Sequence, residues 1–242
     1  MNRKILFAFA LLTAAISAQA SAFDPVTLVW KPKAASVMKY TQKGTIYNAP
    51  IPGMTGDLKF TATVTNTVKE IQSGGNILVE AKQENFTMSV GGQDMGGGPP
   101  NVVEVLTEKP NGFIIARKAD DNAKGGDSPR LDQLQQFTFP DKPVNVGDTW
   151  NLEQKGESAS DTYDSVTEFT FRGADSVNGI AGYKVEFTYK ETNAPTATTA
   201  TGTVWVSQDT CDLLKIVAKI KNAQLGAQLP QPVDMDFSME KI

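Results

Sequence analysis

The chain contains no histidine. Ser–His and Cys–His nucleophiles, imidazole acid–base catalysis and the usual zinc sites all depend on that side chain. A catalytic site would therefore have to be built from serine, lysine, cysteine and carboxylates alone. Several stretches hold such residues at spacings that known sites use, so each has to be compared with an ordinary structural role.

Ser36 and Lys39 have the S-x-x-K spacing of penicillin-binding enzymes, in which the serine and the lysine lie one helical turn apart. The surrounding residues alternate in polarity like a strand, and positions three apart in a strand point to opposite faces. No S-D-N or K-T-G motif follows at a usable place. The sequence therefore predicts a strand here and no catalytic serine.

Asp148-Thr149 and Asp209-Thr210 begin like the paired D-T-G loops of aspartic proteases, whose two carboxylates share one proton. Those loops require glycine in third place, where this chain has Trp150 and Cys211. Aspartate is also common in turns, because its carboxylate hydrogen-bonds its own backbone. Two turns are the favoured interpretation.

A calcium loop is suggested by Asp120, Asn122 and Gly125, which fit its first, third and sixth positions. Lys124 and Leu131 stand at the fifth and twelfth positions, where oxygen ligands are required. A solvated polar loop is the favoured interpretation, and a loose extracellular calcium site is the alternative.

Cys211 is the single cysteine, so an internal disulfide is excluded. It lies between Asp209 and Asp212, and no neighbouring group would lower the pKa of its thiol. A structural thiol is predicted. The sequence thus indicates no catalytic residue, no cofactor-binding residue and no metal ligand, and the protein is expected not to be an enzyme.

The N-terminus predicts export. Arg3 and Lys4 precede an apolar run over residues 5–16, and Ala18-Gln19-Ala20 supplies the small residues that a signal peptidase needs. The run is too short to cross a bilayer, so no transmembrane segment is expected. Residues 1–20 are interpreted as a cleaved bacterial signal peptide, with cleavage after Ala20 or Ala22. The mature protein is expected in the periplasm or outside the cell.

The mature chain is acidic. The signal removes two of the 23 basic residues and none of the 27 acidic ones, which leaves a net charge of −6. This balance argues against nucleic acid or an anionic membrane surface as a partner. About 220 mature residues suffice for one large β domain or two small ones.

Polarity alternates with period two along nearly the whole mature chain. In residues 57–71, apolar Leu58 and Phe60 alternate with Lys59 and Thr61, as in a strand with one dry face and one wet face. Local connections between about ten such strands predict an antiparallel sheet. The predicted strands cover 37–47, 57–71, 77–90, 102–107, 113–117, 150–154, 163–172, 183–190, 203–207, 213–222 and 233–240. A slip in apolar phase predicts a β-bulge near 82–85.

One helix is predicted over residues 129–136, with Ser128 as its cap and Pro129 in its first position. It leads into FTFPDKPVNVGDTW, residues 137–150, in which prolines stiffen the chain and Trp150 anchors the next strand. A strand that starts at Asp57 and turns at glycine is echoed 107 residues later, from Asp164. We interpret residues 137–150 as the joint between two similar halves.

Two segments carry a family resemblance that covers roughly residues 137–220. PDKPVNVGDTW resembles the P-x-x-P-V-x-V-G-D-x-W segment of an uncharacterised exported bacterial family, where it precedes a β-rich C-terminal half. TGTVWVSQDTCDLLKI is similar to a hairpin of LolA-like lipoprotein carriers, whose curved antiparallel sheet wraps an apolar cavity. Cys211 stands where that turn favours glycine, and no arginine matches the gating residue of the carriers.

The sequence therefore predicts an all-β protein: a curved antiparallel sheet or half-barrel with one short helix, or alternatively a β-sandwich. Residues 21–242 form one domain or two similar halves. Long one-face-apolar strands and methionines such as Met88, Met235 and Met239 favour non-catalytic binding of an apolar small molecule or lipid in the concave face. A structural or protein-interaction module of the cell envelope, with an envelope protein as partner, is the alternative. No cofactor is expected.

Overall fold

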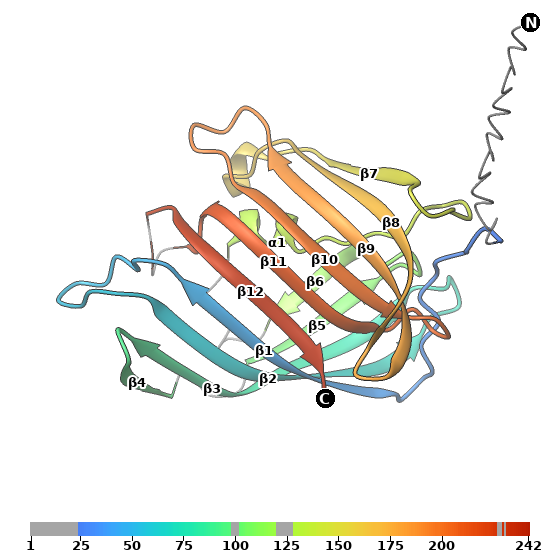
Figure 1. Cartoon of the computed structure of the whole chain (residues 1–242), viewed down its shortest axis with the longest axis horizontal. Coiled ribbons are helices and arrows are strands. Elements are labelled where there is room, and N and C mark those ends of the chain that lie inside the picture. Colours follow the sequence, from blue (N-terminus) through green and yellow to red (C-terminus); the bar gives the residue numbers. More distant parts are fainter. Residues whose placement is uncertain (1–23, 98–101, 120–127, 227–228, 230) are drawn as a thin grey trace, which may run out of the picture.

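The computed structural model describes residues 24–97, 102–119, 128–226, 229 and 231–242. These residues form one large open antiparallel sheet with a single short α-helix, which confirms the predicted all-β class (Figure 1). The elements are β1 (Val37–Ile46), β2 (Leu58–Ile71), β3 (Ile77–Val90), β4 (Gln93–Gly97), β5 (Val102–Glu108), β6 (Ile114–Ala119), α1 (Pro129–Leu134), β7 (Thr149–Gln154), the 3-10 turn η1 (Ser158–Ser160), β8 (Ser165–Val177), β9 (Ile180–Glu191), β10 (Thr199–Ser207), β11 (Leu213–Ala223) and β12 (Val233–Lys241).

The strand order is β6-β5-β3-β2-β1-β12-β11-β10-β9-β8-β7, with β4 paired to β3 outside this path. The first and last strands therefore meet in the middle of the sheet, where Gly44 of β1 lies opposite Phe237 of β12. From there the chain winds outwards to β6, crosses to the far edge at β7 and winds back. The crossover consists of α1 and the stretch 137–148.

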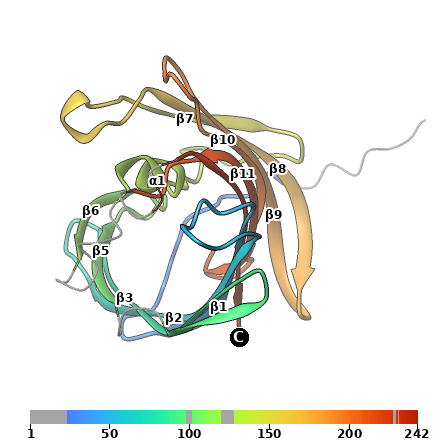
Figure 2. The ribbon, with the colours of Figure 1, turned by 90° about the vertical axis from the view of Figure 1, so that its left-hand side faces the viewer.

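The sheet is strongly rolled, so that β1–β6 curve around one side of α1 while β8–β11 stand on the other (Figure 2). The half-barrel prediction is confirmed. The alternative of a sandwich is wrong, because the strands belong to one continuous hydrogen-bonded sheet rather than to two packed ones. Within the described residues, no helix is long and apolar enough to span a membrane.

The predicted bulge lies where β2 pairs with β3. Thr61 is opposite Thr87, but Thr63 is opposite Glu84, so β3 holds one extra residue at this point. Asn85 takes up the distortion with a φ of 53°. Asparagine tolerates this left-handed conformation better than most residues, which explains why the apolar phase of the strand slips here.

A row of aromatic and small side chains crosses the sheet and allows it to bend. From β2 to β7 its members are Phe60, Gly44, Phe237, Ala218, Gly202, Phe187, Phe169 and Trp150. A Cβ at Gly44 would lie 2.2 Å from the ring of Phe60, and one at Gly202 would lie 2.5 Å from the ring of Phe187. Aromatic rings thus cover the two glycines, an arrangement typical of strongly curved sheets.

The concave face carries a packed apolar core. Its members include Phe169, Val185 and Val204 from the sheet and Leu28, Phe139 and Val144 from the segments that cross over it. A smaller cluster around Tyr40, Val68 and Val79 fills the space beneath β1–β3. Burial at this density is the main source of stability for a chain without disulfides.

Replacing Gly202 by alanine should destabilise the protein by about 1–3 kcal/mol, because the new methyl group would overlap the Phe187 ring and the Val217 carbonyl oxygen. Urea unfolding measures the loss. Gly74→Ala is the matched control, since no atom lies within 4 Å of a Cβ placed there, and it should change stability by less than about 0.5 kcal/mol. Equal effects of the two substitutions would contradict the proposed role of Gly202.

Candidate functional site

The sequence motifs that resemble serine–lysine and aspartic-protease sites lie at the start of a strand and in two turns of the fold. Ser36 precedes β1 and Lys39 lies within it, so the pair lacks the helical spacing that serine–lysine catalysis requires. Asp148 lies in a turn, where its Oδ2 accepts a hydrogen bond from the Asn145 N–H at 2.8 Å. Asp209 also lies in a turn, between β10 and β11. Both aspartates therefore lie in turns, as the turn interpretation predicted.

The remaining candidates are the calcium loop and the single cysteine. Asp120, Asn122, Lys124 and Gly125 of the calcium-loop candidate lie outside the described residues. Across the described part of the chain, no group of three or more histidine, cysteine or acidic side chains could hold a metal ion. The Cys211 thiol is buried, and burial raises its pKa above the ordinary value, which makes the nucleophilic thiolate scarcer.

The methionines proposed to line a pocket pack into the two cores instead. Met235 is buried in the main cluster and Met88 packs against it, while Met239 packs against the smaller cluster. These side chains fill space between strands, as methionine often does.

The two edges of the sheet differ in how they are covered. At β6, the side-chain amide of Gln136 accepts a hydrogen bond from the Ile114 N–H at 3.0 Å and donates one to the Ile114 carbonyl at 3.4 Å. Arg117 of the same strand forms an ion pair at 3.1 Å with Asp132 of α1. The helix and the residues after it thus occupy this edge and supply partners for its backbone.

At the other edge, β7 pairs only with β8 among the described strands. The Phe171 N–H and carbonyl of β8 bond to Asp148 and Gly147 beside β7. Alternate residues of an antiparallel ladder share the same hydrogen-bonding direction. Trp150 and Leu152 therefore bond to β8, whereas the N–H and carbonyl groups of Thr149, Asn151 and Glu153 point away from the sheet.

A groove of about 920 Å³ runs beside this open edge. Its lining includes β7 itself, with the half-buried side chains of Trp150 and Leu152, and the β5–β6 turn with Phe113. Phe139 and Pro140 of the crossover also line it. Lysines and aspartates of the same stretch supply both signs of charge around these apolar groups, and the lining residues are Lys109, Asn111, Phe113, 138–144 and 147–152.

The crossover is fixed tightly enough to keep the groove in shape. Val144 and Val26 exchange two backbone hydrogen bonds of 2.8 and 2.9 Å, and the Phe139 N–H donates to the Asn111 carbonyl at 2.7 Å. Trp150 stacks on Phe169 at a centroid distance of 5.4 Å, and its indole N–H donates to the Thr138 carbonyl at 2.7 Å. The crossover is thus held by the N-terminal segment, by the β5–β6 turn and by the start of β7.

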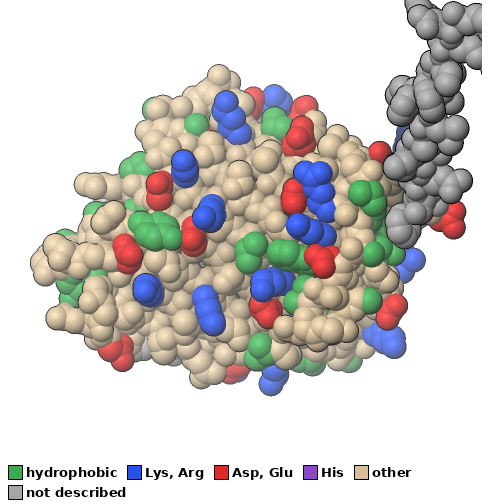
Figure 3. Space-filling view, viewed as in Figure 1, with side chains coloured by type: hydrophobic (Ala, Val, Ile, Leu, Met, Phe, Trp, Pro, Cys, Tyr) green, Lys and Arg blue, Asp and Glu red, His purple; other side chains and the backbone are tan. Residues whose placement is uncertain are grey.

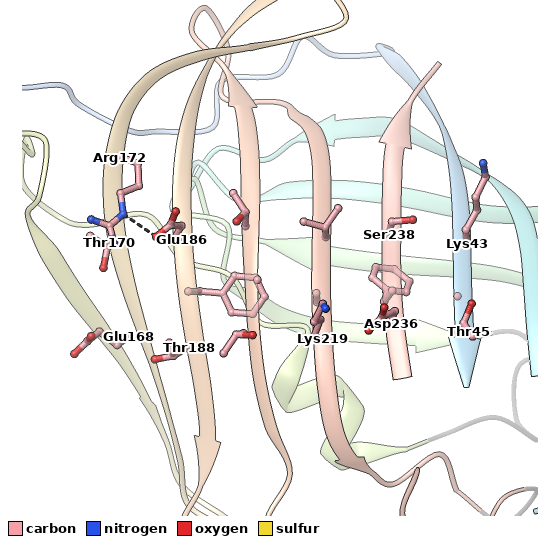
Figure 4. Close-up of a pocket in the computed structure, with 18 residues that line it drawn as sticks. Lys43, Thr45, Glu168, Thr170, Arg172, Glu186, Thr188, Lys219, Asp236 and Ser238 are labelled. Carbon is pink, nitrogen blue, oxygen red and sulfur yellow. Dashed lines mark hydrogen bonds and ion pairs between the residues drawn. The ribbon is translucent and has the colours of Figure 1, made fainter. Parts of the chain in front are cut away.

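A second hollow, of about 740 Å³, lies on the outer face of the sheet and spans β8 to β1. Side chains of both charges are interspersed over this face (Figure 3). The close-up shows short hydroxyl side chains such as Thr170, Thr188 and Ser238 between the charged ones, with Arg172 paired to Glu186 at 2.7 Å (Figure 4). The mixture of opposite charges gives this face no preference for either sign.

A buried ion pair joins α1 to the sheet. The Arg130 guanidinium donates through Nε, at 2.8 Å, and through Nη2 to the two carboxylate oxygens of Glu191, which is 0 % exposed. Arg130 Nη2 also donates to the Thr196 carbonyl at 2.9 Å, and the Thr198 N–H donates to Glu191 at 2.7 Å. The guanidinium lies 5.0 Å from the centre of the Tyr163 ring. The positive charge of Arg130 is therefore paired with the negative charge of Glu191. Nothing in the sequence alone indicated this ion pair.

Glu108, at the end of β5, is the second titratable group that the sequence did not reveal. Burial raises the pKa of its carboxyl from 4.5 to about 7, and the positive charge of Arg117 offsets part of this shift. Burial raises the pKa of Tyr40, and the negative charges of Asp212 and then of Glu108 add to this shift. The carboxyl thus titrates near neutral pH in the folded protein.

Comparison with known proteins gives no family. No family model matches the chain, and no curated protein matches it. Among solved structures, a candidate exported protein with a YmcC-like fold from Bacteroides fragilis matches at 13% identity and a TM-score of 0.34, over 89% of this chain and 97% of its own. DynF from the dynemicin biosynthesis pathway of Micromonospora chersina matches at 10% identity and a TM-score of 0.26, over 90% and 86%. The resemblance to LolA-like carriers is not confirmed, and scores this low say nothing about function.

Arg130→Met should destabilise the protein by about 3–5 kcal/mol, because it leaves the Glu191 carboxylate buried and unpaired. Arg172→Met is the matched control. It removes an ion pair on the exposed outer face, so it should cost less than about 1 kcal/mol. Chemical denaturation of the two variants measures the difference, and similar losses would show that burial does not set the importance of the Arg130 pair.

Glu108→Gln should change how stability depends on pH. Because the folded protein holds this proton up to a pKa of about 7, whereas an ordinary carboxyl releases it near 4.5, ionisation makes the wild type less stable as pH rises through this window. The slope is at most about 1.4 kcal/mol per pH unit. The variant lacks this component, so its stability relative to wild type should increase from pH 4.5 to 7 and then level off. Parallel unfolding curves across that range would contradict the assignment.

Proposed function

We propose that this protein is a non-catalytic exported binding module that takes up an extended polypeptide segment along the free edge of β7. The observation that carries the proposal is the combination at one place of an unpaired strand edge and a groove lined by aromatic and proline side chains. An extended segment that adds a strand to a sheet edge gains main-chain hydrogen bonds, and its alternate side chains fit adjacent pockets.

The geometry defines what the segment must be. It would pair with the outward N–H and carbonyl groups of Thr149, Asn151 and Glu153. Every second side chain would then face the same way as Trp150 and Leu152, towards Phe113 and the groove. The preferred partner is therefore a polypeptide with apolar residues at alternate positions, and it requires no net charge.

The edge is favoured over the concave face, where the sequence placed an apolar ligand. Phe169, Val185 and Leu28 on or over that face are each no more than 1 % exposed and pack against one another. The apolar side of the strands is thus used by the protein's own core. This arrangement supports the interaction module that the sequence offered as the alternative to a lipid-binding protein.

Two further features support the proposal. The chain has no histidine, and the described part holds no cluster of metal-ligating side chains, so a binding role needs the fewest additional groups. The predicted signal peptide at residues 1–20 would deliver the module to the periplasm or the medium. Its partner would then be an envelope or secreted protein.

Asn151→Pro tests the proposal. The Asn151 N–H points to the free edge, so proline removes one outward donor and obstructs pairing without removing a bond to β8. The probe is a synthetic peptide that alternates valine with threonine between terminal lysines, and fluorescence anisotropy follows its binding. We expect the substitution to weaken binding at least about tenfold.

The control for this experiment is Asn151→Val, which alters the same exposed side chain but keeps the backbone donor and should bind the peptide like the wild type. Circular dichroism and the unfolding midpoint confirm that the proline variant is folded. Equal affinity of all three proteins, or equal affinity for a peptide with proline at every second position, would refute pairing at β7.

A further inference from the structure

A group of buried polar atoms lies under α1 with unsatisfied hydrogen-bonding capacity, although the hydroxyl groups of Tyr189 and Ser165 lie close enough to interact with each other. It consists of the hydroxyl oxygens of Ser165, Thr167 and Tyr189 and the side-chain carbonyl oxygens of Gln133 and Gln154. The three hydroxyl-bearing residues are each 2 % exposed. Buried polar atoms in folded proteins are almost always hydrogen-bonded, to the protein or to ordered water, so this group requires an explanation.

The atoms share one corner of the concave face. Ser165 is opposite Gln154 of β7, and Thr167 is opposite Tyr189 of β9. Since Ser165 and Thr167 are two residues apart on β8, their side chains point to the same face. Gln133 of α1 closes the corner from above, because its amide nitrogen donates to the Tyr163 carbonyl at 3.2 Å, just before β8 begins.

We propose that this corner is a binding site for buried water, held between α1 and strands β7, β8 and β9. Three hydroxyl groups can each donate and accept, whereas two amide oxygens only accept. A small neutral molecule with two donors and two acceptors can connect them. One water makes at most about four hydrogen bonds, so satisfying this set takes about two waters.

The neighbouring charges favour a neutral ligand. Arg130 and Glu191 border the corner, but their charges are used in pairing with each other. Because these two charges neutralise each other, neither leaves an unpaired charge that would hold an anion or a cation in the corner. Burial raises the pKa of Tyr189 to about 12, although its contact with Ser165 offsets part of this shift, so its hydroxyl keeps its proton and can donate. These conditions select water over an ammonium, metal or halide ion.

The site has a consequence for the molecule as a whole. Its lining comes from the crossover helix and from three strands, including β7, so the water joins α1 to the edge strand as well as to its neighbours. The polar contact between crossover and sheet is then completed by solvent, next to the Arg130–Glu191 pair. This inference does not depend on what binds at the outer edge of β7.

Oxygen-17 relaxation dispersion, which counts water molecules that stay inside a protein for longer than bulk exchange, tests the proposal on the mature chain. The double variant Ser165→Ala/Thr167→Val removes two of the hydroxyl groups at nearly constant shape. We expect it to lose the signal of about one long-lived water or more relative to wild type. Thr188→Val, on the exposed face of β9, is the control and should leave the count unchanged.

A crystal structure of the wild type provides the second measurement if the double variant does not fold. Water density within hydrogen-bonding distance of Tyr189 and at least one of the two glutamines is expected. Direct hydrogen bonds that satisfy Gln133, Gln154 and Thr167 with no water between them would overturn the proposal. An identical water count in wild type and double variant, or a bound ion in place of water, would do the same.

Discussion

The pairing of the first strand with the last is the constraint on which the rest of this structure depends. With β1 and β12 side by side in the centre, the two halves of the chain meander to opposite edges of one sheet. The chain must therefore cross from β6 to β7, and it does so over the concave face, where Phe139 and Val144 pack into the core. Residues 129–148 make that crossing. The distinctive FTFPDKPVNVGDTW stretch is part of this connection, and its prolines and turn suit an extended path that bonds in turn to Asn111, Val26 and Phe171.

Local features were predictable from the sequence because local residues determine them. The alternation of Leu58, Phe60 and Ala62 identifies β2, the phase slip identifies the bulge at Asn85, and Ser128-Pro129 marks the start of α1. The partner of β1 was not predictable, since its pairing with β12 joins residues almost 200 positions apart and depends on the packing of the whole sheet. Glu191 shows the same limit: in KETNAP it looks like an exposed residue at the end of a strand, yet Arg130 makes it the most deeply buried acid described.

The curvature of the sheet determines how the apolar side chains of the concave face are used. Gly44 and Gly202 let the strands bend, and the rings of Phe60 and Phe187 occupy the space that side chains there would have taken. A sheet rolled this tightly brings its inner face against the crossover, so that Phe139 and Val144 pack on Phe169 and its neighbours. Methionines and one-face-apolar strands suggest a ligand cavity when they are considered one strand at a time. In the folded protein the same apolar surface forms the core. A ligand cavity and a packed core require the same sequence pattern, so the pattern does not distinguish them.

The unequal treatment of the two edges is the strongest reason to assign a function to one of them. Exposed strand edges invite uncontrolled pairing, and natural sheets usually block them with charges, prolines or a covering helix. At β6 the edge is protected by charges and by a covering helix: Arg117 and Lys118 lie on the strand, and α1 with Gln136 covers it. At β7 the sequence TWNLEQ has a single charged residue, Glu153, no proline and no cover from the described residues. The crossover passes close enough to shield β7, yet it leaves a groove there. Because the same chain protects one edge so fully, the open one is better explained as a surface kept for a partner than as an edge left unprotected.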